Sequence, residues 1–237
     1  MKAMIFAAGL GTRFKPWTDK HPKALAIVTG KSLLQRNIEY LQQFGITDII
    51  VNVHHFADQV LETIKNNKGW KSNITISDEK NEVLETGGGL KKVSWYFDDG
   101  SFVVMNVDIL TDLDLQAMIN FHQQNKPLAT LAITSRKTSR YFLFDEDDNL
   151  CGWRNVKTNE QKISIEKHDL VQKAFSGIHI IEPKIFPLIT QTGKFSIVDT
   201  YLDLVKSEII KGFDHSNSKL IDVGKPESLI EAEKLFS

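Results

Sequence analysis

The feature that most constrains the fold is a short apolar run that leads directly into a loop containing two glycines. Residues 2–7 form the run, and the loop reads Ala7-Ala8-Gly9-Leu10-Gly11-Thr12-Arg13-Phe14. Glycines let backbone N–H groups approach an anion closely, and concave runs of amides bind phosphate. Arg13 and the later Lys23 bring two cations toward the same place. The segment therefore predicts a buried first strand that ends in a phosphate-binding loop.

Apolar runs alternate with stretches of helical periodicity through the first half of the chain, which is typical of βαβ units. We expect strands at 2–7, 48–53, 73–77, 101–107 and 128–134, and helices at 33–44, 56–64 and 113–122. The fold class predicted from this pattern is α/β. Its core is a single Rossmann-like, mostly parallel sheet flanked by helices.

The pattern changes after residue 135. Short strands are expected at 140–144, 150–154, 162–165 and 174–181, then helices at 184–189 and 198–211, a strand at 219–223 and a helix at 226–236. The acidic turn at 145–149 could bind a metal, but a solvated hairpin tip is the favoured interpretation. We expect one domain, 1–237, with a nucleotide-binding half (about 1–135) and a smaller, β-rich second-substrate half (about 136–237).

Composition excludes several classes of partner. The 237 residues carry a net charge of −1, so no broad basic field attracts nucleic acid or anionic lipid. The single cysteine, Cys151, excludes an internal disulfide framework and is expected to have a packing role. No membrane span is expected, and the apolar N-terminus is interpreted as a strand rather than a signal peptide. We therefore expect a cytoplasmic protein, and infer no nucleic acid, no membrane and no obligate protein partner.

Two aspartates follow apolar strands. Asp108 comes after 101–107 and Asp222 lies near the end of 219–223. Ligands of open parallel sheets bind beyond the carboxyl ends of the strands, and Mg²⁺ takes one or two carboxylates together with phosphate oxygens. Either residue alone is equally well explained as a helix or turn cap. Together with the loop, they favour a metal site.

Two common nucleotide motifs do not fit. A dinucleotide fingerprint needs a third glycine where Phe14 stands, and the strand 48–53 is followed by His54-His55 rather than by a carboxylate. No Gly-Lys-Ser/Thr closes a P-loop. Further along, Gly87-Gly88-Gly89 precedes a helical stretch. Three glycines are costly in a plain helix start, so we interpret them as backbone that contacts a flat ligand such as a base.

These segments resemble the sugar-1-phosphate nucleotidyltransferases. The resemblance is carried by the loop of residues 7–14, by Pro16 and by Pro22-Lys23-Ala24-Leu25. It extends over nearly the whole chain through Asp108, 175–179, 197–202 and Asp222-Val223-Gly224. The short length and the segment 82–89 are most similar to the N-acetylmuramate-1-phosphate uridylyltransferase branch.

The resemblance implies a role for each matching residue. Nucleotide binding would fall to Ala8, Gly9, Gly11, Thr12, Arg13, Lys23, Glu85, Thr86 and Gly87. The last three of these would meet the base, and Asn106 with Gly177 would line the sugar pocket. Arg13, Lys23 and Asp108 would be catalytic, and Asp108 with Asp222 would bind Mg²⁺. Val107 departs from a Gly-Asp pair common in the family, and Glu166-Lys167-His168 matches a Glu-Lys-Pro motif only in part.

The activity expected from the resemblance is Mg²⁺-dependent transfer of a nucleotidyl group from an NTP to a sugar 1-phosphate. UTP and N-acetylmuramate 1-phosphate are the favoured substrates. The sugar phosphate is mostly dianionic at neutral pH, so no general base is required. Enzymes that use GTP, dTTP or CTP with mannose-, heptose-, glucose- or choline-type phosphates remain open. A non-catalytic nucleotide-sugar sensor of the same fold is the alternative from another class.

Overall fold

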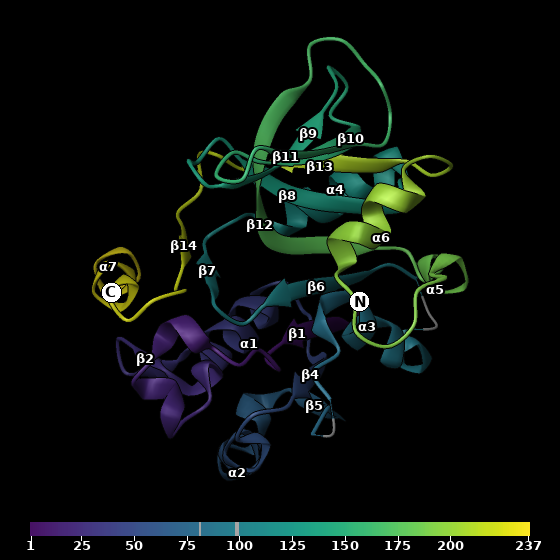
Figure 1. Cartoon of the computed structure of the whole chain (residues 1–237). Helices are drawn as coiled ribbons and strands as arrows, with labels where there is room; N and C mark the ends of the chain where they lie inside the picture. Colours follow the sequence, from purple (N-terminus) through teal and green to yellow (C-terminus); the bar gives the residue numbers. More distant parts are fainter. Residues whose placement is uncertain (81, 98–99) are drawn as a thin grey trace.

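The computed structural model of the chain describes residues 1–80, 82–97 and 100–237 (Figure 1). Its large sheet contains β1 (Ala3–Phe6), β4 (Asp48–Val53), β5 (Asn73–Asp78), β6 (Phe102–Asn106), β8 (Ala129–Thr134), β9 (Arg140–Phe144), β10 (Leu150–Asn155), β11 (Glu160–Ile163), β12 (Val171–Ile181) and β13 (Ile210–Asp214). The order is β11-β10-β9-β12-β6-β1-β4-β5, and β8 pairs with both β12 and β13.

The sheet is mixed around a parallel centre. Strands β6, β1, β4 and β5 run parallel, whereas β12 is antiparallel to β6, β8 and β9. Figure 1 shows β9, β10 and β11 at the end of the molecule opposite β4 and β5. The predicted Rossmann-like sheet with flanking helices is confirmed. The division near residue 135 stays a prediction, and both apolar cores contain residues from before and after it.

Strand β1 explains why helices cover both faces of the sheet. Its four residues are buried, with Ala3 and Ile5 in one apolar core and Met4 and Phe6 in the other. Successive strand residues point to opposite faces, so a continuous apolar run requires a cover on each side. The first core is covered by α1 (Leu33–Gln43), α2 (Ala57–Asn66), α4 (Leu115–Asn125) and α7 (Ser228–Leu235). The second is covered by α3 (Glu85–Lys92), α5 (Ile185–Leu188) and α6 (Ile197–Leu204).

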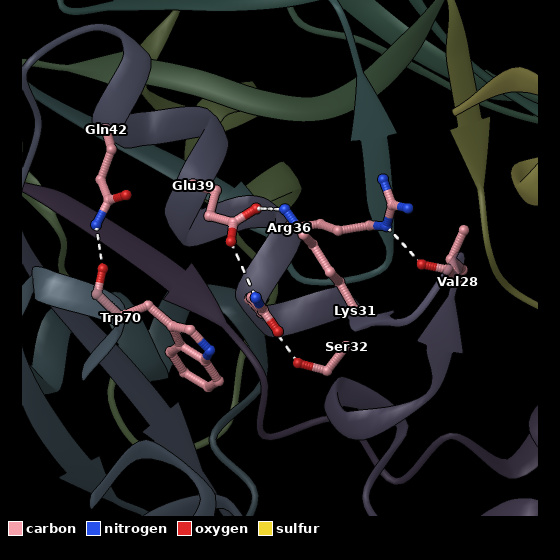
Figure 2. Close-up of polar contacts among 8 residues, drawn as sticks. Val28, Lys31, Ser32, Arg36, Glu39, Gln42 and Trp70 are labelled. Carbon is pink, nitrogen blue, oxygen red and sulfur yellow. Dashed lines mark hydrogen bonds and ion pairs between the residues drawn. The ribbon is translucent and has the colours of Figure 1, made fainter. Parts of the chain in front are cut away.

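Helix α1 is held by polar contacts along its length. The Ser32 hydroxyl caps its N-terminus by accepting from the Gln35 amide at 3.1 Å. Figure 2 shows Arg36 donating to the Val28 carbonyl at 2.8 Å and Gln42 donating to the Trp70 carbonyl at 2.7 Å. Lys31 also pairs with Glu39 at 2.6 Å (Figure 2). These contacts tie the helix to the hairpin of β2 (Ile27–Val28) and β3 (Lys31–Ser32) and to the turn at 68–71.

From this fixed helix, Asn37 reaches the end of the central strand. Its amide nitrogen donates to the Val107 carbonyl at 2.8 Å and to the Leu33 carbonyl at 2.8 Å, and the residue is 1% exposed. A buried amide so paired resists displacement, because breaking either bond leaves a polar atom without water. The backbone immediately before Asp108 is therefore fixed in place by α1.

Asp222 reaches the same region by a route that differs from the prediction. Its strand, β14 (Leu220–Asp222), is not part of the large sheet but pairs antiparallel with β7 (Ile109–Thr111) in a small ribbon. Asp222 is opposite Ile109, and the Val223 amide donates to the Asp108 carbonyl at 2.8 Å. The two aspartates are neighbours because β7 continues from β6 and carries β14 beside it.

The helix expected at 198–211 was too long. Helix α6 ends at Leu204, and residues 210–214 form β13, which runs parallel to β8. Ile210 and Gly212 are buried and alternate with residues that are half-buried, which is a strand period rather than a helical one. A Cβ at Gly212 would come within 2.4 Å of Ile133, so this glycine allows the close approach to β8.

The position expected for the three glycines was also wrong. They lie within α3 rather than ahead of it, and all three are buried. A Cβ on Gly87 would lie 2.4 Å from the Phe195 ring, and one on Gly88 would lie 2.2 Å from the Gly193 carbonyl oxygen. The glycines let α3 pack tightly against the segment before α6. Their absent side chains make this packing possible, and contact of their backbone with a base stays a prediction.

Two smaller expectations are confirmed. Residues 145–149 form the tight turn between β9 and β10, where the Asp145 carboxylate accepts from the amides of Asp147 and Asn149. Cys151 is buried, and burial raises the pKa of its thiol. Over the three described stretches, no helix combines the length and apolar character needed to span a lipid bilayer.

Candidate active site

A cavity of about 450 Å³ opens beyond the carboxyl ends of β1 and β6. Ten of the predicted site residues line it: Ala8, Gly9, Gly11, Thr12, Arg13, Lys23, Glu85, Thr86, Asn106 and Asp108. Its remaining walls are Phe6, Ala7, Asn52, Glu79, Val83, Val107 and Gly224. The cavity therefore contains the glycine loop, two basic side chains and three carboxylates.

The glycine loop is held open by its own turn. Gly11 has φ +60°, and the Thr18 hydroxyl donates to its carbonyl at 2.9 Å. A Cβ on Gly11 would lie 2.8 Å from the Thr18 methyl group, so a side chain is excluded here. The Phe14 amide donates to the same carbonyl at 2.8 Å, and the Phe14 ring is buried. Gly9 has open space beside it, which leaves its backbone accessible to a phosphate.

Two residues that the sequence did not single out fix the start of this loop. The Asn52 side-chain oxygen, at the end of β4, accepts from the amides of Ala7 at 2.7 Å and Ala8 at 3.3 Å. Its nitrogen donates to Glu79 at 2.8 Å, and the second Glu79 oxygen accepts from the Leu84 amide at 3.1 Å. Both side chains are 2% exposed. This pair connects the glycine loop to the start of α3.

The signal that could have revealed the pair is polarity within an apolar context. Asn52 interrupts the run Ile49–Val53, and a polar residue buried in a central strand requires a partner. Its neighbour His54 contributes as well, since Nδ1 of the ring lies 2.7 Å from the Glu79 carbonyl oxygen. This contact gives His54 a packing role at the end of β4.

The charged centre of the site joins Lys23 and Asp108. The lysine ammonium lies 2.6 Å from Oδ2 of Asp108, and the side chains are 11% and 24% exposed. Lys23 also lies over the Phe14 ring, 5.6 Å from its centre. A partly buried pair of this kind is shielded from water, so its attraction is stronger than that of a surface pair.

Asp222 stands beside this pair. The side chain is exposed, but the protein around it partly desolvates the carboxyl and raises its pKa; the negative charge of Asp108 raises it further, and Lys23, Arg13 and Arg136 act in the opposite direction. The Arg13 guanidinium lies next to Gly224, where a Cβ would be 3.4 Å from it and 3.0 Å from the Asp222 carboxylate. The carboxylates of Asp108 and Asp222 repel each other, and the charges of Lys23, Arg13 and Arg136 offset this repulsion.

This donor set fits a hard divalent cation. Carboxylate oxygens suit Mg²⁺, which commonly takes one or two of them and completes its shell with substrate phosphates and water. No cluster of three or more histidine, cysteine or acidic residues capable of holding a metal occurs in the described part of the chain. A cation at Asp108 and Asp222 would therefore need further ligands from the substrates and from water.

Three predicted contacts lie outside the cavity walls. Gly87 packs on Phe195, and its amide donates to the Phe195 carbonyl at 2.9 Å. Gly177, with φ +73°, lies against Asn106, where a Cβ would come within 2.7 Å of the amide nitrogen. Its role in the structure is to make room for Asn106. Asp222 adjoins the cavity through Gly224 and Arg13, as described above.

The remaining base-side residues lie at the start of α3. Glu85 has φ +58°, and its exposed carboxylate lies 3.6 Å from the Lys194 ammonium group. The Thr86 hydroxyl accepts from the Ile197 amide at 3.0 Å. Val107, the departure from the family pattern, is 6% exposed and belongs to the first apolar core. Its carbonyl is the acceptor for Asn37, so it contributes both a wall of the cavity and an anchor.

The nucleotidyl transferase family matches residues 2–236, nearly the entire chain. The chain belongs to this family. It is 38% identical to the N-acetylmuramate alpha-1-phosphate uridylyltransferase of Neisseria meningitidis serogroup B, over 99% of this chain and 98% of that protein. It is 30% identical to the UTP--glucose-1-phosphate uridylyltransferase of Synechocystis sp., over 95% of this chain but only 60% of the length of that relative.

A solved structure has the same fold. HddC from Yersinia pseudotuberculosis, in complex with GMP-PN, superposes with a TM-score of 0.77 at 26% identity. The alignment covers 100% of this chain and 99% of that one. The resemblance inferred from the glycine loop and the Pro-Lys pair is thereby confirmed at the level of the family.

Asn52 offers a test of the loop anchor. Replacing it with alanine leaves the buried amides of Ala7 and Ala8 without their acceptor, at a cost of about 1–3 kcal/mol. We expect Asn52→Ala to weaken binding of a nucleoside triphosphate about tenfold, measured by calorimetry. Asn125→Ala, at an exposed helix end, is the matched control and should leave binding unchanged. Unaltered affinity in Asn52→Ala would show that the anchor does not shape the site.

Asp222 offers a test of the cation site. Since its raised pKa means that the folded protein disfavours the charged form, Asp222→Asn should not lower the melting temperature of the metal-free protein near pH 7. Mg²⁺ with a nucleoside triphosphate, at about 100 times the dissociation constant, should stabilise the parent by about 2.7 kcal/mol. That stabilisation should be lost in Asp222→Asn and kept in Asp147→Asn, an exposed turn residue. A lower melting temperature with an intact Mg²⁺ response contradicts the assignment.

Proposed function

We propose that the protein is a sugar-1-phosphate nucleotidyltransferase that transfers a uridylyl group from UTP to N-acetylmuramate 1-phosphate and releases pyrophosphate. The observation that carries the proposal is the convergence of Arg13, Lys23, Asp108 and Asp222 beside the glycine loop. The choice of substrates is supported by the Neisseria relative, which matches over almost its whole length.

Nucleotide binding begins at the glycine loop. The amides near Gly9 and Gly11 face the triphosphate, and the anchor formed by Asn52 and Glu79 keeps them in place before substrate arrives. Such preorganised donors stabilise charge without reorganising during the reaction. The Arg13 guanidinium lies at the end of the same loop, beside Gly224. The base lies toward Val83, Glu85 and Thr86 at the opposite end of the cavity.

Transfer needs two polyanions to meet in line at the α-phosphorus. An oxygen of the sugar phosphate forms the new bond to phosphorus, and the bond to pyrophosphate breaks. Lys23 neutralises charge at this centre, having Asp108 as its partner until substrate phosphates compete for the ammonium group. When bound at Asp108 and Asp222, Mg²⁺ supplies Lewis-acid stabilisation of the phosphate oxygens.

Proton transfer has no part in this scheme. The attacking phosphate is already mostly a dianion at neutral pH. In agreement with that chemistry, neither histidine nor cysteine occurs among the residues found to line the cavity. Catalysis then rests on positioning and on electrostatic stabilisation, and the cytoplasm, where nucleoside triphosphates and Mg²⁺ are abundant, is the location we propose.

Use of a different base is a second candidate within the same reaction class. HddC, whose structure contains GMP-PN, aligns with this chain end to end, which favours GTP as the alternative donor. The walls at Val83, Glu85 and Thr86 would decide between the bases. A sensor that binds nucleotide sugars without turnover is the candidate from another class.

A matrix of pyrophosphate-release assays tests the proposal. UTP, GTP, dTTP and CTP are each combined with several sugar 1-phosphates, with and without Mg²⁺. We expect the highest rate with UTP, N-acetylmuramate 1-phosphate and Mg²⁺ together, and a loss of at least about 100-fold in the double variant Asp108→Asn with Asp222→Asn. Full activity of that variant would contradict the assignment of Asp108 and Asp222 as metal ligands. Tight binding without pyrophosphate release over the whole panel would instead identify a sensor.

A further inference from the structure

Three buried polar atoms gather in the second half of the chain without a hydrogen-bond partner. They are the Thr134 hydroxyl, Nε of Arg136 and Nδ1 of His215. Thr134 is 4% exposed and His215 is 5% exposed. Among the described residues, only Ser77 and Thr200 have another such side-chain atom. Buried polar groups are nearly always paired in folded proteins, so this concentration calls for a physical reason.

The pairing of the strands brings these side chains together. Strand β13 runs parallel to β8 with Asp214 beside Ile133, and the His215 amide donates to the Ile133 carbonyl at 3.0 Å. His215 therefore lies next to Thr134, the last residue of β8. Arg136 follows two residues later and is close enough to lower the pKa of His215.

The cluster is fixed to β12 just before Gly177. Nη2 of Arg136 donates to the Phe175 carbonyl at 2.9 Å, and Nε2 of His215 lies 2.7 Å from the Ser176 hydroxyl. Burial lowers the pKa of His215 to about 4, so its ring is neutral at pH 7. When Ser176 donates to Nε2, the ring proton is at Nδ1 and is free to donate.

Arg136 is also close to the catalytic centre in electrostatic terms. Its positive charge acts to lower the pKa of the Asp222 carboxyl, as the charges of Lys23 and Arg13 do, so the Arg136 guanidinium lies within electrostatic reach of that carboxyl. No ion pair of Arg136 is found within the stretches that the structure describes. A half-buried guanidinium without a carboxylate partner is a ready site for an anion, and its planar fork matches a carboxylate.

The phosphate groups of both substrates already have cations in Arg13 and Lys23. We propose that Arg136, with Thr134 and His215, binds a carboxylate carried on the sugar ring of the second substrate, such as the lactyl carboxylate of N-acetylmuramate 1-phosphate. The inference rests on the proposed function and deepens it, because it names the group that distinguishes an acidic sugar from a neutral one. The guanidinium, the hydroxyl and the imidazole N–H supply three donors for two carboxylate oxygens.

The test compares two sugars that differ in this group. We measure kcat/KM with UTP for N-acetylmuramate 1-phosphate and for N-acetylglucosamine 1-phosphate, which lacks the lactyl ether. The parent should prefer the acidic sugar about 10- to 100-fold. Arg136→Met should remove most of that preference and change the rate with the neutral sugar less than about threefold. Arg140→Met, an exposed arginine of β9, is the control and should behave as the parent.

A second variant separates recognition from folding. Thr134→Val removes a buried hydroxyl that has no partner, so the melting temperature should stay the same or rise. The preference for the acidic sugar should nevertheless fall several-fold. Equal losses with both sugars in Arg136→Met, or a parent without preference, would overturn the inference.

The two proposals fail in distinguishable ways. If the parent turns over neither sugar with any nucleotide, the proposed function is wrong. The carboxylate site is then judged by calorimetric binding of the two sugar phosphates to the parent and to Arg136→Met. Preferential binding of the acidic sugar that depends on Arg136 supports the site, and equal affinities overturn it.

Discussion

The ion pair between Lys23 and Asp108 is the contact around which the site is arranged. It spans the cleft between the Pro22-Lys23-Ala24 turn and the end of the central strand β6 at 2.6 Å. Both ends are fixed, since Ala24 is buried in the first apolar core and Asn37 holds the carbonyl before Asp108. The ammonium group neutralises one of two neighbouring carboxylates that repel each other, and the second, Asp222, is the residue proposed to bind a cation with it.

The fold supplies these charges from segments far apart in sequence. A parallel centre places the glycine loop and Asp108 at the same edge of the sheet, as the carboxyl ends of β1 and β6 lie side by side. The β7–β14 ribbon then carries Asp222 back to Asp108 from more than a hundred residues away. Around this core, Asn52 and Asn37 anchor the backbone of the glycine loop and of the residue before Asp108.

Local patterns predicted the parts of the structure that depend on local physics. The spacing of apolar residues located β1, β4 and α1 closely, because burial of one or both faces of an element requires apolar residues at a regular spacing. Most of the cavity wall followed from the glycine loop and its family resemblance. Beyond Leu204 the same reasoning failed, since β13 is defined by its pairing with β8 rather than by its own composition.

Tertiary partners explain what the sequence could not reveal. Gly87 and Gly88 of α3 have no room for a side chain because Phe195 and Gly193 pack against them. These two contact residues follow more than a hundred residues later in the chain. Asn52 and Glu79 meet across two strands, and Arg136 meets His215 only when β8 and β13 are paired. Each of these contacts involves single polar residues that belong to no motif, so the spacing of apolar residues along the sequence does not predict them.

The central claim is that Lys23 acts at the reacting phosphate rather than only in the fold. Its most direct test is the steady-state rate of pyrophosphate release in Lys23→Met, with Lys20→Met, an exposed lysine close in sequence, as the control. We expect kcat to fall about 100- to 1,000-fold in Lys23→Met with a cooperative melting transition retained, and no change in Lys20→Met. A folded Lys23→Met variant with kcat within about twofold of the parent would contradict this account.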